Sequence, residues 1–211
     1  PLGDRTSPPP LLPAPRDNLP AVEQRYRFIR LLGAGAMGEV YLAEHTALGR
    51  REAVKILRPE LATDPQFIAG FRREARATNR VQHPNIVGVY DFGKLSDGRF
   101  YLAMEYADGV PLDQLLAASA RLPVARALPI LIQLADAVGH AHAHGVVHRD
   151  LKPGNLILGE HRGQSDYVKV LDFGMAKFVT SQANDAPHRS RVGTIMGTPS
   201  YMAPEYVSGQ P

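Results

Sequence analysis

Cysteine is absent from this 211-residue chain, which excludes disulfide bonds and thiolate metal sites. The absence agrees with a reducing compartment, so we expect a cytoplasmic location for this part of the protein. Blocks of basic residues are absent too, because the 24 Lys and Arg and the 21 Asp and Glu are spread along the chain. This composition does not favour a nucleic-acid partner.

A hydrophobic run long enough to cross a membrane is also absent. The most apolar long segment, residues 128–147, is interrupted by Gln133, Asp136 and three histidines, so we interpret it as a core helix. No secretory signal is visible. The three histidines are spaced two residues apart, and that spacing does not bring helical side chains onto one metal ion.

Proline, by contrast, is abundant at the start, where it supplies seven of the first twenty residues. Proline removes backbone donors and favours extended polyproline geometry. We interpret residues 1–24 as a disordered tail, with a docking motif as the alternative.

Short apolar runs rich in β-branched and aromatic residues then predict strands. The runs are Tyr26–Leu32, Val40–Ala43, Ala53–Leu57, Ile86–Phe92 and Phe100–Tyr106. Between the third and fourth runs, residues 64–81 form a polar helical segment, with Asp64-Pro65 as its cap and first turn. The first half of the chain therefore predicts a small β-lobe, residues 25–106, with one main helix.

The character becomes helical after Tyr106. We expect helices over residues 112–118 and 124–144, and a short hairpin from residues 156–158 and 168–171. The fold class is therefore α+β, with a helix-rich second lobe over residues 107–211 and a hinge near residues 105–109.

A glycine-rich stretch follows the first predicted strand. Residues 33–40 read Gly-Ala-Gly-Ala-Met-Gly-Glu-Val, and glycines let backbone N–H groups approach phosphate oxygens. The pattern alone fits a glycine-rich hairpin turn equally well. A dinucleotide fold requires a helix after the last glycine, whereas Val-Tyr-Leu-Ala predicts a strand.

Two charged residues lie on the next predicted elements. Lys55 is on the third strand, and Glu74 lies nineteen residues later in the helical segment. A carboxylate facing Lys55 would hold the ammonium toward phosphates. Taken singly, each is more typical of a solvated surface residue.

The loop after the long helix carries three side chains with different chemistry, an acid, an amine and a carboxamide. Residues 148–155 read His-Arg-Asp-Leu-Lys-Pro-Gly-Asn. Asp150 can accept or orient a hydroxyl proton, Lys152 can neutralise phosphate charge, and Asn155 can bind Mg²⁺ through its side-chain oxygen.

Asp-Phe-Gly occurs twice, starting at Asp91 and at Asp172. The tripeptide alone does not separate a metal site from a strand that enters a turn. Asp172 follows the loop with Asp150, whereas Asp91 precedes a tight Asp97-Gly98 turn. We therefore interpret Asp91 as part of a hairpin.

The order of glycine loop, strand lysine, helix glutamate, His-Arg-Asp and Asp-Phe-Gly resembles the protein kinase family. Lys152 is the serine/threonine-kinase form, and Gly-Ala-Met-Gly with His-Pro-Asn-Ile-Val at residues 83–87 is similar to bacterial, eukaryotic-like kinases. The resemblance implies a bilobal kinase-like fold, and a serine/threonine kinase that uses ATP and Mg²⁺.

The resemblance also implies site roles. Lys55 would pair with phosphates and with Glu74, Asp150 would be the catalytic base aided by Lys152, and Asn155 and Asp172 would carry Mg²⁺. The nucleotide-binding residues would be Leu32, Gly33, Ala34, Gly35, Gly38, Val40, Ala53, Lys55, Met104, Glu105, Ala107 and Ile157.

Partners and regulation follow from the same resemblance. It implies a protein substrate with a Ser or Thr acceptor, self-association for autophosphorylation, and activation-segment phosphorylation read by Arg149. The candidate acceptors are Ser190, Thr194 and Thr198.

The resemblance runs out near the end, since Ala203-Pro204-Glu205 normally closes the activation segment and the chain stops at Pro211. We expect an incomplete large lobe and a poorly stable kinase with weak or no turnover, unless a partner or a swapped segment completes the lobe. In a membrane-anchored parent protein the span would lie outside this segment. The alternative function is a nucleotide-binding regulatory module.

Overall fold

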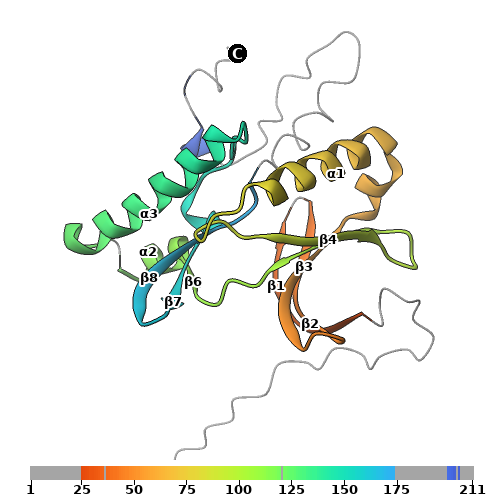
Figure 1. Cartoon of the computed structure of the whole chain (residues 1–211), viewed down its shortest axis with the longest axis horizontal. Helices are drawn as coiled ribbons and strands as arrows, with labels where there is room; N and C mark the ends of the chain where they lie inside the picture. The colour runs from red at the N-terminus through yellow and green to blue at the C-terminus, as the bar shows by residue number, and fades with distance from the viewer. Residues whose placement is uncertain (1–24, 36, 120, 174–198, 203, 205–211) are drawn as a thin grey trace, which may run out of the picture.

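The computed structural model describes residues 25–35, 37–119, 121–173, 199–202 and 204. Figure 1 shows two parts, a larger β-sheet with helix α1 and a second part that contains α2, α3 and a small sheet. The bilobal α+β prediction is confirmed for this part of the chain. The predicted tail and the candidate acceptors Ser190, Thr194 and Thr198 lie outside the described residues.

The first lobe is a five-stranded antiparallel sheet in the order β1-β2-β3-β5-β4. Its strands are β1 (Tyr26–Gly35), β2 (Gly38–His45), β3 (Arg50–Leu57), β4 (Val89–Lys94) and β5 (Phe100–Glu105). Each corresponds to a predicted run, although most begin or end a few residues away from the prediction. The central position of β3 places Lys55 between two neighbouring strands.

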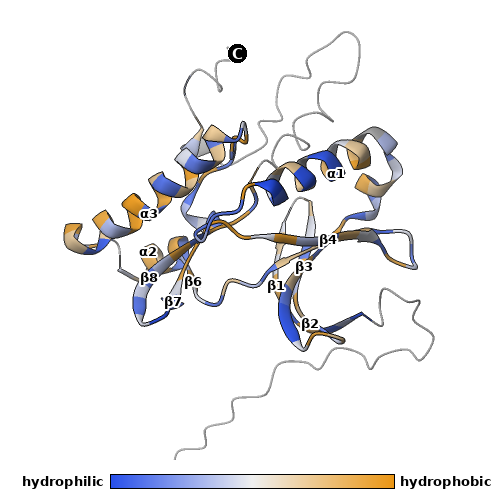
Figure 2. Ribbon diagram, in the orientation of Figure 1, coloured by the Kyte–Doolittle hydropathy of each residue, from blue (hydrophilic) through white to orange (hydrophobic). Residues whose placement is uncertain are grey.

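Helix α1 (Pro65–Arg80) follows a short 3-10 helix, η1 (Pro59–Thr63), and packs on one face of this sheet. Asp64 caps the helix, since its Oδ1 accepts the Phe67 N–H at 3.2 Å. Phe67, Phe71 and Ala75 repeat every four residues and are buried against the sheet. Figure 2 shows hydrophilic and hydrophobic patches on α1, as expected for a helix with one buried face.

The first Asp-Phe-Gly copy is a structural part of β4. The Asp91 carboxylate accepts a hydrogen bond from the Tyr101 hydroxyl at 2.7 Å and pairs with Arg25 at 2.6 Å. Phe92 packs on the opposite side, with its ring 5.8 Å from that of Phe71. The prediction that Asp91 belongs to a hairpin is confirmed by its place in the β4–β5 pairing.

Gly93 leaves room for the buried ring of Tyr101. A Cβ on Gly93 would lie 2.6 Å from that ring, and Tyr101 is only 1% exposed. We predict that Gly93→Ala lowers the free energy of unfolding by about 1–3 kcal/mol through overpacking. Chemical denaturation measures this change. Gly139→Ala on the exposed face of α3, where a Cβ would meet nothing within 4 Å, should instead stabilise by about 0.5–1 kcal/mol. Equal effects of the two substitutions would contradict the prediction.

The second lobe combines two helices and a three-stranded antiparallel sheet. Its elements are β6 (Val110–Pro111), α2 (Leu112–Ser119), α3 (Val124–Ala143), the 3-10 helix η2 (Pro153–Asn155), β7 (Leu156–His161), β8 (Gln164–Val170) and the 3-10 helix η3 (Pro199–Tyr201). Ile130, Ala137 and Ala141 of α3 form a common buried core with residues of β7 and β8. No helix in the described segments combines the length and the apolar content needed to cross a bilayer.

A loop of the first lobe is hydrogen-bonded directly to the second. The side-chain amide of Asn85 donates to the Val168 carbonyl at 2.8 Å and to Gln133 of α3 at 3.1 Å. Ile86 forms a bridge with Val170 of β8. The predicted strand start at Ile86 is therefore wrong, because residues 86–88 lie outside β4, which begins only at Val89.

Candidate active site

The glycine-rich residues form the hairpin between β1 and β2, with Gly33 opposite Val40 and Gly35 opposite Gly38. A strand follows the last glycine, as the sequence predicted. A Cβ on Gly33 or Gly35 would meet nothing within 4 Å, so both glycines border open space. Gly38 differs, because its φ is 154° and a Cβ there would lie 1.9 Å from the Ile56 carbonyl oxygen. Gly38 thus allows the hairpin to pack closely on β3.

Arg58 ties this hairpin to the end of β3. Its Nε and Nη2 donate to the Gly35 carbonyl at 3.2 and 3.0 Å, and its backbone N–H donates to the Met37 carbonyl at 3.0 Å. The hairpin is therefore held from β3 by three hydrogen bonds. This role of Arg58 was not predicted, because Arg58 belongs to no motif.

Lys55 and Asp172 form an ion pair that joins the two lobes. The Lys55 Nζ lies 3.0 Å from the Asp172 Oδ2, and the residues are 117 positions apart. The lysine side chain is 8% exposed and the aspartate side chain 34%. Burial raises the pKa of Asp172, but attraction to Lys55 outweighs burial and leaves the pKa below its ordinary value. Asp172 is therefore a carboxylate at neutral pH.

Asp150, Lys152 and Asn155 lie together in the loop after α3. The Lys152 Nζ lies 2.8 Å from the Asp150 Oδ2. The Asn155 side-chain amide donates to the Asp150 carbonyl at 2.7 Å and to its carboxylate at 3.3 Å. These bonds use the Nδ2 of Asn155 as donor, which leaves its Oδ1 as the side-chain oxygen for a cation.

The Lys55–Asp172 pair is connected to the loop of Asp150 and Asn155 by a backbone hydrogen bond of Leu171. The Leu171 N–H donates to the Asn155 carbonyl at 2.9 Å, so the residue beside Asp172 is bonded to the loop that carries Asp150. Lys55, Asp150, Asn155 and Asp172 are thus brought to one region between the lobes. This is the arrangement on which the sequence-based hypothesis depends.

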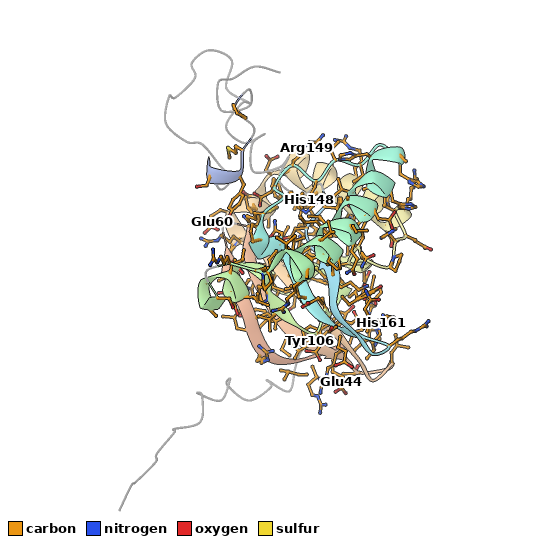
Figure 3. The ribbon with its side chains drawn as sticks, turned by 90° about the vertical axis from the view of Figure 1, so that its left-hand side faces the viewer. Glu44, Glu60, Tyr106, His148, Arg149 and His161 are labelled. Carbon is orange, nitrogen blue, oxygen red and sulfur yellow. The ribbon has the colours of Figure 1, made fainter. Side chains whose placement is uncertain are left out.

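His148 supports this region from the core. It is 3% exposed, its ring lies 4.6 Å from that of Phe173, and its Nδ1 accepts the Asp150 N–H at 3.3 Å. With Nδ1 as acceptor, the proton is on Nε2, which donates to the Leu171 carbonyl at 2.8 Å. His148 and Arg149 are labelled in Figure 3. Arg149 has a φ of 67°, in the left-handed region that non-glycine residues rarely adopt.

Several of the expected nucleotide-binding residues lie on β2, β3, β5 and β7. Ala53 is opposite Met104 in the sheet, and both are packed with Val40 and Ala107. On β7, Leu156 and Leu158 enter the second-lobe core, so Ile157 between them faces the other side of the strand.

Glu105 is already hydrogen-bonded within the protein. Its N–H donates to the Gly88 carbonyl at 2.8 Å, and its carboxylate pairs with Lys169 at 2.5 Å. The Glu105 N–H is therefore already used as a donor inside the protein. Glu74 lies in α1, but its side chain is outside the described residues.

Comparison with known proteins decides the family. A family profile for the protein kinase domain matches residues 26–211. The chain belongs to the protein kinase family.

Three curated relatives of this kinase are bacterial serine/threonine-protein kinases. The kinase pkn3 of Myxococcus xanthus is 42% identical over 188 residues, covering 89% of this chain and 34% of the relative. PknA of Mycobacterium tuberculosis is 45% identical over 189 residues, covering 88% and 42%, and PrkC of Bacillus subtilis is 39% identical over 188 residues, covering 89% and 28%. The kinase chain thus spans less than half the length of each relative.

A solved structure is similar over most of the chain. A double mutant of the Mycobacterium tuberculosis PknI kinase domain matches with a TM-score of 0.67 and 35% identity, covering 89% of this kinase chain and 67% of that structure. The match supports the bilobal fold described above.

The burial of His148 predicts a pH-dependent stability. Burial lowers the pKa of His148 below its ordinary value, against the opposing effects of its hydrogen bond to Leu171 and of nearby Asp172. As the pH falls below about 6.5, His148 is protonated in the unfolded chain but stays neutral in the folded chain. Protonation then stabilises only the unfolded chain, whereas above that pH His148 is neutral in both. We therefore expect the free energy of unfolding to decrease as the pH is lowered from about 6.5, by at most about 1.4 kcal/mol per pH unit.

Urea denaturation between pH 7 and pH 5 measures this slope. His148→Asn should flatten it, whereas His142→Gln, at an exposed position of α3, should retain it. The same slope in the His148 variant as in the wild type would assign the pH dependence to other groups.

Proposed function

We propose that the protein transfers the γ-phosphoryl group of ATP to serine or threonine hydroxyls of proteins. The observation that carries this proposal is the meeting of the Lys55–Asp172 pair with the Asp150–Lys152–Asn155 group. The presence of every one of these side chains favours an enzyme over a module that only binds nucleotide.

The residues fit the ATP and Mg²⁺ that the protein kinase family uses in general. Asp172 supplies a carboxylate oxygen and Asn155 an amide oxygen, and oxygen ligands are those that Mg²⁺ prefers. The glycine hairpin offers open space beside Gly33 and Gly35, where phosphate oxygens can approach backbone N–H groups. Asp172 and Asn155 would hold the Mg²⁺, which would supply positive charge that neutralises the phosphates.

The protein's own groups position and polarise the reactants. Lys55, buried on β3, presents its ammonium to phosphate charge while Asp172 restrains it at 3.0 Å. Lys152 lies against Asp150 at 2.8 Å and can neutralise charge on the transferred group. Asp150 accepts the proton of the acceptor hydroxyl, and Asn155 fixes the orientation of its carboxylate.

Substrate and location follow from this chemistry. We propose a protein acceptor, because the bacterial relatives are named serine/threonine-protein kinases. A second copy of the chain can serve as acceptor during autophosphorylation. Because ATP is the donor, the kinase part is proposed to work in the cytoplasm.

Phosphate transfer tests this function directly. The purified protein is incubated with ATP, Mg²⁺ and a generic basic protein substrate, and modified residues are located by mass spectrometry. We expect phosphoserine and phosphothreonine on the substrate or on the protein itself. Phosphotyrosine alone, or binding of ATP without any transfer, would overturn the proposal.

A further inference from the structure

Thr78 makes an unusual contact for a threonine in a helix. Such hydroxyls commonly bond to a carbonyl one turn earlier in their own helix. The Thr78 Oγ1 instead donates to the Phe173 carbonyl at 3.2 Å, 95 residues away. Thr78 is 4% exposed and lies near the end of α1, so this bond connects α1 to the residue after Asp172.

The two carbonyls that flank Asp172 are both held by side chains. The Leu171 carbonyl accepts from His148 at 2.8 Å, and the Phe173 carbonyl accepts from Thr78. Asp172 itself has a φ of 55°, in the left-handed region. A non-glycine residue persists there only when its surroundings fix it. The two bonds supply that fixation at the residues immediately before and after Asp172.

The backbone of Asp172 determines where its carboxylate points. In the present conformation the carboxylate lies 3.0 Å from the Lys55 Nζ. We propose that Thr78 is a positioning residue, whose hydroxyl holds the Phe173 carbonyl and so aims Asp172 at Lys55 and the metal position. This inference rests on the proposed function and concerns the Thr78 hydroxyl.

The bond connects α1 to the residue after Asp172 through a hydrogen bond as well as through packing. Thr78 lies on the buried face of α1, about one turn after Ala75, which packs against the sheet. A valine at this position keeps the shape and the packing but removes the donor.

Two variants separate the hydroxyl from the shape. Thr78→Val keeps the branched shape and removes the donor, while Thr78→Ser keeps the donor. Thr63→Val is the control, because the exposed Thr63 makes a comparable hydroxyl bond to the Glu60 carbonyl at 2.8 Å, away from the site. Each purified protein is examined by amide hydrogen exchange without nucleotide, and by kinetics over a range of Mg²⁺ concentrations.

We expect Thr78→Val to speed exchange of the Leu171 amide, which donates to the Asn155 carbonyl, and to lower kcat/KM for Mg-ATP, each about tenfold, the effect of leaving a buried carbonyl unpaired. The Mg²⁺ concentration for half-maximal rate should rise. Thr78→Ser should restore most of both properties, and Thr63→Val should change neither.

Normal exchange and normal Mg²⁺ dependence in Thr78→Val would overturn the inference, as would equal damage in Thr78→Ser. Because exchange is measured without nucleotide, it tests Thr78 even if the wild-type protein transfers no phosphate. A wild-type protein that transfers no phosphate would count against the proposed function, but not against the role of Thr78.

Discussion

The Asp150→Asn variant is expected to bind Mg-ATP as the wild type does and to transfer phosphate about 10² to 10⁴ times more slowly, the usual contribution of a positioned general base. The substitution keeps the size of the side chain but removes its ability to accept the hydroxyl proton. It also removes the negative partner of Lys152, which lies 2.8 Å from the carboxylate. Initial rates of phosphate transfer and calorimetric titration with Mg-ATP measure the two effects separately.

Asp136→Asn is the matched control for this variant. Asp136 is on α3, its side chain is 74% exposed, and it pairs with His83 away from the catalytic loop. The control should transfer phosphate at the wild-type rate. If Asp150→Asn also keeps the wild-type rate, Asp150 is not the base.

Asp172→Asn should lower the transfer rate by about 10² to 10³, comparable to the removal of one preorganised electrostatic group. The variant loses a charged ligand for Mg²⁺ and leaves the largely buried Lys55 opposite a neutral amide. ATP affinity should also become nearly independent of Mg²⁺. Calorimetric titration with ATP, with and without Mg²⁺, measures this dependence, and initial rates measure the transfer.

The other Asp-Phe-Gly copy supplies the control inside the same chain. Asp91→Asn weakens the contacts with Arg25 and Tyr101, so it should lower the melting temperature. Its Mg²⁺-dependent ATP binding should remain intact. A loss of Mg²⁺ dependence in Asp91→Asn, with none in Asp172→Asn, would reverse the assignment of the two copies.

Local sequence patterns were sufficient to predict most of the fold. The first lobe follows from short β-branched runs and from one capped helix, because alternation and capping are local properties. Asp64 caps α1 as expected. The start of β4 was misplaced, because Ile86 is apolar like a strand residue but is paired with Val170 of the other lobe. A partner so distant in sequence leaves no local periodicity.

One part of the candidate site was predictable from the sequence, because its loop combines residue types that seldom occur together. Asp150, Lys152 and Asn155 are close in the chain, so their proximity followed from the loop itself. The contacts of Thr78, Arg58 and His148 were not predicted, since each is a hydrogen bond to a backbone carbonyl that any residue could provide. The division of the chain at residues 106 and 107, and the role of each site residue, stay predictions.

Anomalous scattering from Mn²⁺ tests the central claim most directly. Crystals of the protein are grown with Mn²⁺ in place of Mg²⁺ and with an ATP analogue that cannot transfer its γ-phosphate. We predict a metal peak about 2.1 Å from oxygens of both Asp172 and Asn155, with Lys55 against the phosphates. A nucleotide-bound metal that contacts neither Asp172 nor Asn155 would contradict the account.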